Sequence, residues 1–216
     1  MAFLVKGRPG MEPVDKHQTS GGIWIVVLAA GHATRMGTPK MLLQVNGEGM
    51  LKGIVRTALS VVNKVAVVLK REGKEEEALL NTLPVTLLKP ATGKTLMSDS
   101  LKTAIEFCVE TKAEAVIILL GDQPGLDPVV ISQLKNAYEA TKKPIIQAKY
   151  WDGPGHPILF DQHLFAELLD ITGDQGARAV LKRHSANRVL VPIDHNQPKD
   201  IDTLEDYFTY IKSNGR

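Results

Sequence analysis

The stretch IWIVVLAAGHATRMGTPK, which spans residues 23–40, decides the fold. Its first part, from Ile23 to Ala29, is apolar at every position, as expected of a parallel strand that is covered by helices on both faces. Small residues end the run at Gly31, and Arg35 and Lys40 follow in the same loop. An all-apolar strand that opens into such a loop predicts an open α/β sheet with a ligand site at its carboxyl edge.

The chain after this stretch alternates between strand-like and helix-like patterns. Apolar runs at 64–69, 85–88, 115–120 and 144–148 alternate with amphipathic segments at 51–61, 74–83, 98–109 and 128–140. After Tyr150 the pattern changes: 151–157 is turn-rich, 158–160 is apolar, and helical patterns follow at 162–169 and 177–183. The alternation predicts an α/β fold with a doubly wound, mostly parallel sheet.

Size and composition favour one domain. The chain has 216 residues, of which 44% are hydrophobic and 23% charged, and one core can serve that length. We expect residues 1–22 to be a flexible N-terminal arm and residues 23–216 to form a single domain, in which about 150–190 is an elaboration on the acceptor side.

The charge and the apolar runs limit the partners. A net charge of +2 without a basic block argues against nucleic acid and against a membrane surface. No apolar run reaches the roughly 18 residues of a membrane span, so we expect a cytoplasmic protein. The single cysteine, Cys108, sits in a helical apolar pattern and is expected to pack in the core.

The loop after the first strand suits a nucleotide. Leu28, Ala29, Ala30 and Gly31 allow the backbone to approach a base or phosphate closely, and Arg35 and Lys40 supply charge for a triphosphate. The alternative is an ordinary surface turn with two cations.

Acidic residues lie at two further places where a metal ion could bind. Gly121 and Asp122 follow an apolar strand, and Asp122 would face the phosphate loop if the two strands are neighbours. Mg²⁺ favours one or two carboxylates together with phosphate oxygens. Asp200 or Asp202 would supply the second carboxylate, although residues of this type before a helix also serve as caps. Asp127, before Pro128, is the better cap for its own helix.

Other motifs carry less weight. Gly93-Lys94-Thr95 resembles part of a P-loop, but the first glycine of that motif would fall at Leu88, and the dinucleotide fingerprint is missing after the first strand. The histidines show no spacing typical of a zinc site. His156, between Gly155 and Pro157, is interpreted either as an acceptor contact in an exposed loop or as a turn residue without a role.

Together these segments resemble the MobA-like nucleotidyltransferases, specifically their molybdenum cofactor cytidylyltransferase branch. The resemblance runs from about Ile23 to the end of the chain and rests on five segments: 28–40, Gly121-Asp122-Gln123-Pro124, Pro154-Gly155-His156-Pro157, Gly173-Asp174-Gln175-Gly176-Ala177-Arg178 and Asp200-Ile201-Asp202-Thr203. It implies a Rossmann-like, GT-A-like nucleotidyltransferase fold and transfer of CMP from CTP to the terminal phosphate of molybdopterin, with release of pyrophosphate.

The resemblance also implies roles for individual residues. Leu28, Ala29, Ala30, Gly31, Arg35, Lys40, Gly121 and Asp122 would bind the nucleotide, with Arg35, Lys40 and Asp122 catalytic. Asp122 with Asp200 or Asp202 would hold Mg²⁺, and Ser98, Ser100, Gly155 and His156 would meet the acceptor. The product would pass to a molybdoenzyme or its chaperone.

Two details bear on the substrates. Ala30 stands where guanylyl-transferring relatives carry glycine, which favours a pyrimidine base. Asp99 adds negative charge between Ser98 and Ser100, and Leu204 replaces the common proline. A nucleotidyltransferase for a sugar or polyol phosphate and a catalytically silent nucleotide-binding module therefore remain alternatives.

Overall fold

The computed structural model describes residues 21–31, 39–90, 96–173 and 176–214. Most of the expected N-terminal arm and the whole of segment 32–38, including Arg35, therefore lie outside the described residues. Gly21 and Gly22 join the domain, because Gly21 N donates to Thr111 O and Glu114 N donates to Gly22 O. Within this part of the chain, no helix is both long and apolar enough to cross a membrane.

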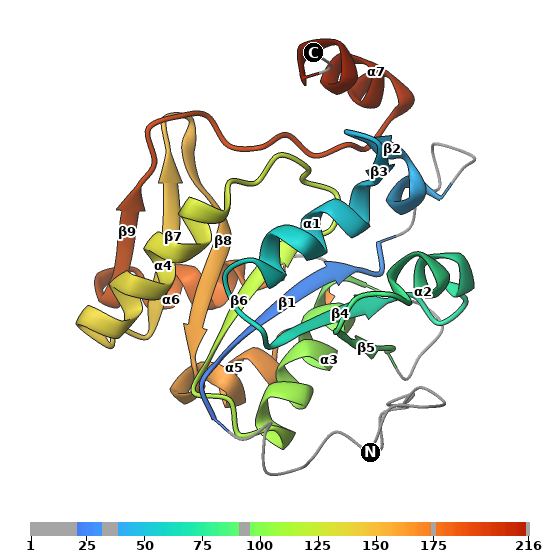
Figure 1. Ribbon diagram of the computed structural model, residues 1–216. Coiled ribbons are helices and arrows are strands. Elements are labelled where there is room, and N and C mark those ends of the chain that lie inside the picture. Colours follow the sequence, from blue (N-terminus) through green and yellow to red (C-terminus); the bar gives the residue numbers. More distant parts are fainter. Residues whose placement is uncertain (1–20, 32–38, 91–95, 174–175, 215–216) are drawn as a thin grey trace.

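One seven-stranded sheet forms the centre of the molecule (Figure 1). Its strand order is β5-β4-β1-β6-β8-β7-β9, and only β8 runs opposite to the others. The predicted mostly parallel α/β fold is thus confirmed. The strands are β1 (Ile23–Ala29), β4 (Val65–Leu69), β5 (Thr86–Leu88), β6 (Ala115–Leu120), β7 (Ile145–Tyr150), β8 (Gly153–Asp161) and β9 (Arg188–Pro192).

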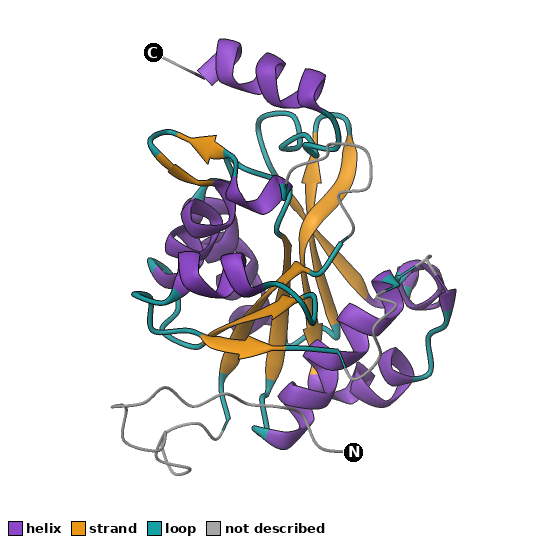
Figure 2. Ribbon diagram, turned by 90° about the vertical axis from the view of Figure 1, so that its right-hand side faces the viewer, coloured by secondary structure: helices purple, strands orange, loops and turns teal. Residues whose placement is uncertain are grey.

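Helices cover both faces of the sheet, which Figure 2 shows close to edge-on. The continuous apolar runs require this, since each strand has two buried faces: Ile25 and Val27 belong to one core cluster, whereas Trp24 and Val26 belong to the other. On one face pack α1 (Met50–Leu59), α2 (Lys74–Leu80) and α4 (Pro128–Thr141), and on the other α3 (Met97–Glu110), α5 (Phe165–Leu169) and α6 (Arg178–Arg183). Cys108 is fully buried on α3, as expected, and the Asp127 side chain caps α4 by accepting from Val129 N at 2.8 Å.

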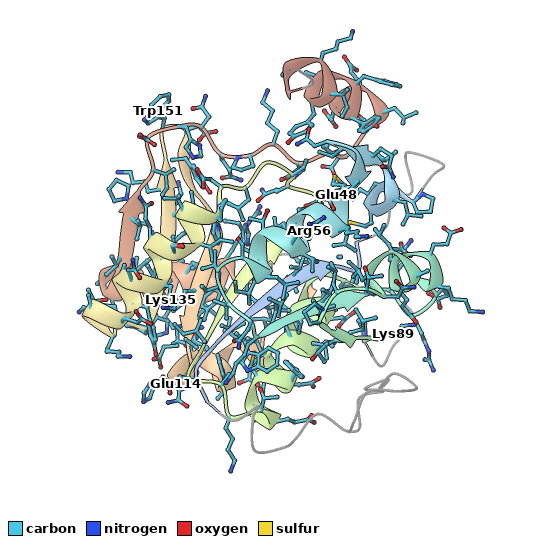
Figure 3. The ribbon with its side chains drawn as sticks, in the orientation of Figure 1. Glu48, Arg56, Lys89, Glu114, Lys135 and Trp151 are labelled. Carbon is cyan, nitrogen blue, oxygen red and sulfur yellow. The ribbon has the colours of Figure 1, made fainter. Side chains whose placement is uncertain are left out.

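The second half of the sheet differs from the sequence prediction. The segment interpreted as turn-rich, 151–157, is mostly strand: β8 begins at Gly153 and pairs antiparallel with both β6 and β7. Glycine and proline hid this strand, and the register of its pairing with β7 shifts between Gln147 and Lys149, as at a bulge. The turn itself is confined to the tip, where Trp151 is 73% exposed (Figure 3).

Three further strands were also not predicted. The edge strand β9 pairs parallel with β7. The short strands β2 (Gln44–Val45) and β3 (Glu48–Gly49) form a separate hairpin, which contacts α1 through Arg56 Nη1 and Glu48 Oε2 at 3.3 Å (Figure 3). Strands of two residues give no periodic signal.

The chain after β9 crosses the carboxyl edge of the sheet before it enters α7 (Leu204–Asn214), as the red segment of Figure 1 shows. Ile201 is buried, and its N–H donates to Asp122 O at 2.9 Å. Tyr207 of α7 donates through its hydroxyl to Gln44 O at 2.8 Å. This crossing brings the C-terminal aspartates to the end of β6.

The close approach of β1 and β6 predicts that Gly121→Ala destabilises the fold. A Cβ at Gly121 would lie 2.9 Å from Ala29 Cβ and 3.1 Å from Leu28 O, so the strand ends must move apart. Overpacking of this kind costs about 1–3 kcal/mol. We expect chemical denaturation to show this loss for Gly121→Ala. The control is Gly53→Ala in α1, where the new Cβ meets only Glu48 at 3.6 Å and the variant should be neutral or stabilised. Equal stability of the two variants would contradict the prediction.

Candidate active site

A buried lysine joins two of the three acidic positions to the loop after β1. Lys40 begins the 3₁₀ turn Lys40–Leu42 and is only 6% exposed. Its ammonium donates to Asp122 Oδ2 at 2.8 Å and to Asp202 Oδ1 at 3.0 Å. Three sequence-predicted residues, far apart along the chain, are therefore brought together at the carboxyl edge of the sheet.

Asp200 lies beside this group. Gln123 Nε2 donates to Asp200 Oδ1 at 2.7 Å. Burial raises the pKa of Asp200; the bond from Gln123 opposes this, and the nearby negative charges of Asp122 and Asp202 raise the pKa further. The three carboxylates are thus close enough to repel one another.

The side chain of Asp202 faces the site and does not cap α7. The cap is formed by Thr203 and Asp206: Thr203 N and Oγ1 donate to Asp206 Oδ2, and Asp206 N donates to Thr203 Oγ1. Asp202 contributes only its backbone N–H to this arrangement. The capping alternative for Asp202 is therefore replaced by an ion pair with Lys40.

Lys40 balances the acidic charge. Burial by itself would lower the pKa of Lys40, but the ion pair with Asp122, strengthened by the hydrogen bonds to Asp122 and Asp202, outweighs it and raises the pKa above its ordinary value. The ammonium is therefore charged wherever the protein is folded near neutral pH.

The donor set suits a hard divalent cation. Carboxylate oxygens are the ligands that Mg²⁺ prefers, and a divalent ion would relieve the repulsion among Asp122, Asp200 and Asp202. Within the described residues, no three acidic, histidine or cysteine side chains converge into a ready-made metal cluster. Lys40 supplies the positive charge between Asp122 and Asp202 instead, and substrate phosphates would have to complete the coordination of a metal.

A pocket of about 670 Å³ opens next to this edge and continues along the face of the sheet that carries α3, α5 and α6. Asp200 and Gln123 lie at its edge end, and Met97 and Leu101 of α3 form part of its wall. The remaining lining residues come from β1, β6, β7, β8, β9, α6 and their loops: Leu28, Ile118, Leu120, Gln147, Pro154, Gly155, His156, Ile158, Phe160, Gly176, Ala177, Arg178, Leu181, Lys182, Ser185, Arg188 and Gln197.

The residues expected to hold the nucleotide lie at the end of β1. Leu28 lines the pocket, Ala29 and Ala30 are buried in the two opposite core clusters, and Gly31 is exposed. Gly121 N donates to Leu28 O at 2.9 Å, which fixes Asp122 beside this strand end. The neighbouring strands β1 and β6 thus provide the switch-point geometry that the sequence predicted.

His156 lies on β8 rather than in the exposed loop that the sequence suggested. The backbone around it is tied down: Tyr150 donates through its hydroxyl to His156 O at 2.7 Å, and Gln147 Nε2 donates to Gly155 O at 3.2 Å. Gly155 allows Gln197 to pack against it, since a Cβ there would lie 1.8 Å from Gln197 Oε1. The imidazole borders the pocket, and burial lowers the pKa of His156 to about 4, against the opposing charge of Asp122.

The two serines predicted to bind the acceptor are not at the pocket wall. Ser98 and Ser100 are buried at the start of α3, and the residues of this helix that line the pocket are Met97 and Leu101. Asp99 caps the helix, since its Oδ2 accepts from Leu96 N at 3.0 Å. An acceptor role for these serines stays a prediction.

Several pocket residues received no role from their sequence positions. Gln123 could have been found, because it follows Asp122 directly and shares its strand end. Gln147, Arg188 and Gln197 gave no signal, because each lies in a segment without a motif. The pairing of β7 with β9 brings Gln147 and Arg188 to one wall, and the bond from Gln197 N to Asp152 Oδ1 holds Gln197 near the tip that leads into β8.

The fold and this edge site define a nucleotidyltransferase-like α/β protein. The chain belongs to the MobA-like NTP transferase family, whose domain model matches residues 25–189. It is 28% identical to the purine catabolism protein PucB of Bacillus subtilis (strain 168) over 195 residues, which cover 84% of this chain and 92% of PucB.

Two solved proteins have the same architecture. Rv0371c from Mycobacterium tuberculosis H37Rv is 27% identical with a TM-score of 0.79, covering 88% of this chain and 97% of that one. The structure of Rv0371c in complex with manganese is 26% identical to this chain with a TM-score of 0.74, and the match covers 89% of this chain and 99% of that one. A nucleotidyl transferase from Methanothermobacter is 21% identical with a TM-score of 0.74, at coverages of 88% and 96%, and shows likeness of fold alone.

The half-buried position of His156 on the pocket wall predicts that its imidazole stays neutral in mildly acidic solution. Its pKa is lowered to about 4 in the folded protein, so the unfolded chain binds more protons once the pH falls below about 6.5. Stability from this residue is complete above that pH and is lost progressively down to about 4. NMR should show no titration of the His156 ring between pH 8 and 5.5. The variant His156→Gln identifies the NMR signal of this ring, because the signal disappears. The same variant should lose less stability in acid than the original protein. A His156 ring that titrates near 6.5 would contradict the prediction.

Proposed function

We propose that the protein transfers CMP from CTP to the terminal phosphate of molybdopterin and releases pyrophosphate. The observation that carries this proposal is the buried Lys40 held between Asp122 and Asp202 at the edge where β1 and β6 end. Such a cation, with carboxylates beside it, suits a metal-bound triphosphate. The family and the motifs quoted above support the particular substrates.

The nucleotide half of the site would use the end of β1. The backbone of Leu28, Ala29, Ala30 and Gly31 would hold the base and phosphates, and Arg35 and Lys40 would balance the triphosphate. A phosphate oxygen of the acceptor would attack the α-phosphorus of CTP in line. A new phosphorus–oxygen bond forms as the bond to the bridging oxygen of pyrophosphate breaks. The protein would contribute positioning and charge rather than covalent chemistry.

A divalent metal belongs to this proposal. Asp122 with Asp200 or Asp202 would hold Mg²⁺, and the manganese complex of Rv0371c supports a divalent ion in this family. When bound, the metal would neutralise phosphate oxygens and polarise the reacting phosphorus. The Gln123 hydrogen bond would keep Asp200 oriented for that task.

Another phosphorylated acceptor, such as a sugar or polyol phosphate, is the second candidate. The observation that favours it is Asp99, whose carboxylate caps α3 next to the pocket residue Met97. This carboxylate already occupies the start of the helix and weakens the assignment of the molybdopterin phosphate to Ser98 and Ser100, which leaves room for an acceptor whose phosphate binds elsewhere.

A substrate screen tests the proposal. Pyrophosphate release is measured for the four nucleoside triphosphates, each with molybdopterin, a sugar phosphate and a polyol phosphate, and we expect the highest rate with CTP and molybdopterin. Asp122→Asn should lower this rate on the order of a hundredfold, with the fold retained by circular dichroism. Asp127→Asn is the matched control, because asparagine caps α4 as well as aspartate does. Nucleotide binding without any pyrophosphate release would point to a silent module.

Base choice has its own test. Ala30 adds a methyl group at the end of β1, and we expect Ala30→Gly to raise the ratio of GTP to CTP turnover by up to about tenfold, the usual effect of one methyl group. Steady-state kinetics with both nucleotides gives the ratio. Because Ala30 is buried, a thermal melt must accompany the measurement. An unchanged ratio in a folded variant would remove this argument for CTP.

A further inference from the structure

The pocket has opposite charges at its two ends. Asp200 lies at the catalytic edge, whereas Arg178, Lys182 and Arg188 line the part formed by α6 and β9. Arg178 and Lys182 are one helical turn apart on α6, and the short turn Ser185–Asn187 leads directly from this helix to Arg188. None of the three cations forms an ion pair with a carboxylate of the described residues.

Arg188 is the most constrained of the three. Its Nη1 donates to Gln147 Oε1 at 2.9 Å. Gln147 is 4% exposed, and its Nε2 donates in turn to Gly155 O at 3.2 Å. The Arg188 Nε is buried and has no hydrogen-bond partner among the described residues. The guanidinium is therefore held in place by a neutral amide that cannot balance its charge.

Such a guanidinium lowers the stability of the folded protein unless a ligand accepts its free hydrogen bond and balances its charge. Arg188 is half-buried, and its buried Nε donor has lost its bond to water without gaining another, so a bound anion would recover free energy there. Arginine binds the paired oxygens of a carboxylate or phosphate better than any other side chain. The two exposed cations of α6 increase the attraction for negative charge at the same end.

We propose that Arg188, with Lys182 and Arg178 beside it, binds a second anionic group of the acceptor, remote from the phosphate that reacts. The name acceptor rests on the proposed function, whereas the anion site itself does not. The carboxylates at the sheet edge repel an anion that no metal ion shields, so the second anionic group binds at the other end of the pocket. The pocket would thus orient a substrate that carries a carboxylate or phosphate at its far end.

The strand register sets the length of such a substrate. Arg188 is paired with Ile145, and Ile145 with Phe160, which lies four residues beyond His156 on β8. At roughly 3.3 Å per residue this separation is about 13 Å along the strand, and about 7 Å at the level of Ile158, the partner of Gln147. Because β9 is also two strands away from β8, the spacing across the sheet adds to this separation, and the second anionic group is expected on the order of 10 Å or more from the part of the acceptor next to His156.

Calorimetry with inorganic phosphate tests the anion site directly. The full chain is first saturated with Mg²⁺ and α,β-methylene CTP, so that the nucleotide half is filled. Arg188→Gln should weaken phosphate binding ten- to a hundredfold, and Arg188→Lys by less, because lysine keeps the charge without the paired donors. Lys182→Gln changes an exposed side chain and should weaken binding about threefold, which keeps a test available if Arg188 variants do not fold.

Arg183→Gln is the matched control. Arg183 is on the same helix, but its guanidinium pairs with Glu167 and does not line this pocket. Its phosphate affinity should stay within twofold of the original protein. Absence of phosphate binding, or equal affinity in Arg188→Gln, Lys182→Gln and Arg183→Gln, would overturn the proposal.

Kinetics with molybdopterin separates this proposal from the proposed function. Arg188→Gln should raise the acceptor KM at least tenfold, while kcat and the KM for CTP stay within twofold. If the original protein binds phosphate through Arg188 but does not use molybdopterin, the acceptor assignment fails and the anion site stands. If molybdopterin is used with the same KM by Arg188→Gln, the anion site fails and the proposed function stands.

Discussion

The site depends on one buried ion-paired group, the ammonium of Lys40 between Asp122 and Asp202. It joins the segment after β1, the end of β6 and the C-terminal crossing, which are far apart in sequence. Lys40 is buried, whereas the side chains of Asp122 and Asp202 are 25% and 59% exposed, so solvent screens part of each attraction. The ion pairs therefore gather one cation and two carboxylates at the position where a charged substrate would bind.

The two halves of the pocket follow from the topology. The parallel strands β1 and β6 end at the same edge and deliver small residues, Asp122 and Lys40 there. The reversed strand β8 then widens the sheet and allows β7 and β9 to add polar side chains below that edge. Gln147 connects the two regions, since it bonds both Arg188 and the backbone of Gly155. One side chain therefore separates Arg188 from the backbone of Gly155, the residue before His156.

The sequence predicted the first half of the fold closely and the second half poorly, for a physical reason. Strands such as β1 and β6 are buried on both faces, so every residue is apolar and their bounds were predicted to the residue. The strand β8 begins with glycine and proline, and β9 is a half-exposed edge strand, so neither has a clear period. Lys40, Asp122, Asp200 and Asp202 could be proposed as site residues because each borders a recognisable element. Arg188 has no such neighbour, and its role in the pocket depends on pairing between distant strands.

The C-terminal crossing shows why a local motif is not enough to build the site. Asp200 and Asp202 reach the edge only because Ile201 between them is buried and its N–H is bonded to Asp122 O. Successive side chains of an extended segment point in opposite directions, so burying Ile201 turns both aspartates toward Lys40 and Gln123. The bond from Tyr207 to Gln44 O holds α7 beside the β2–β3 hairpin and fixes where this segment ends. The burial of the apolar Ile201 thus determines where the side chains of Asp200 and Asp202 lie. This burial requires the first strands and the last helix to be folded together.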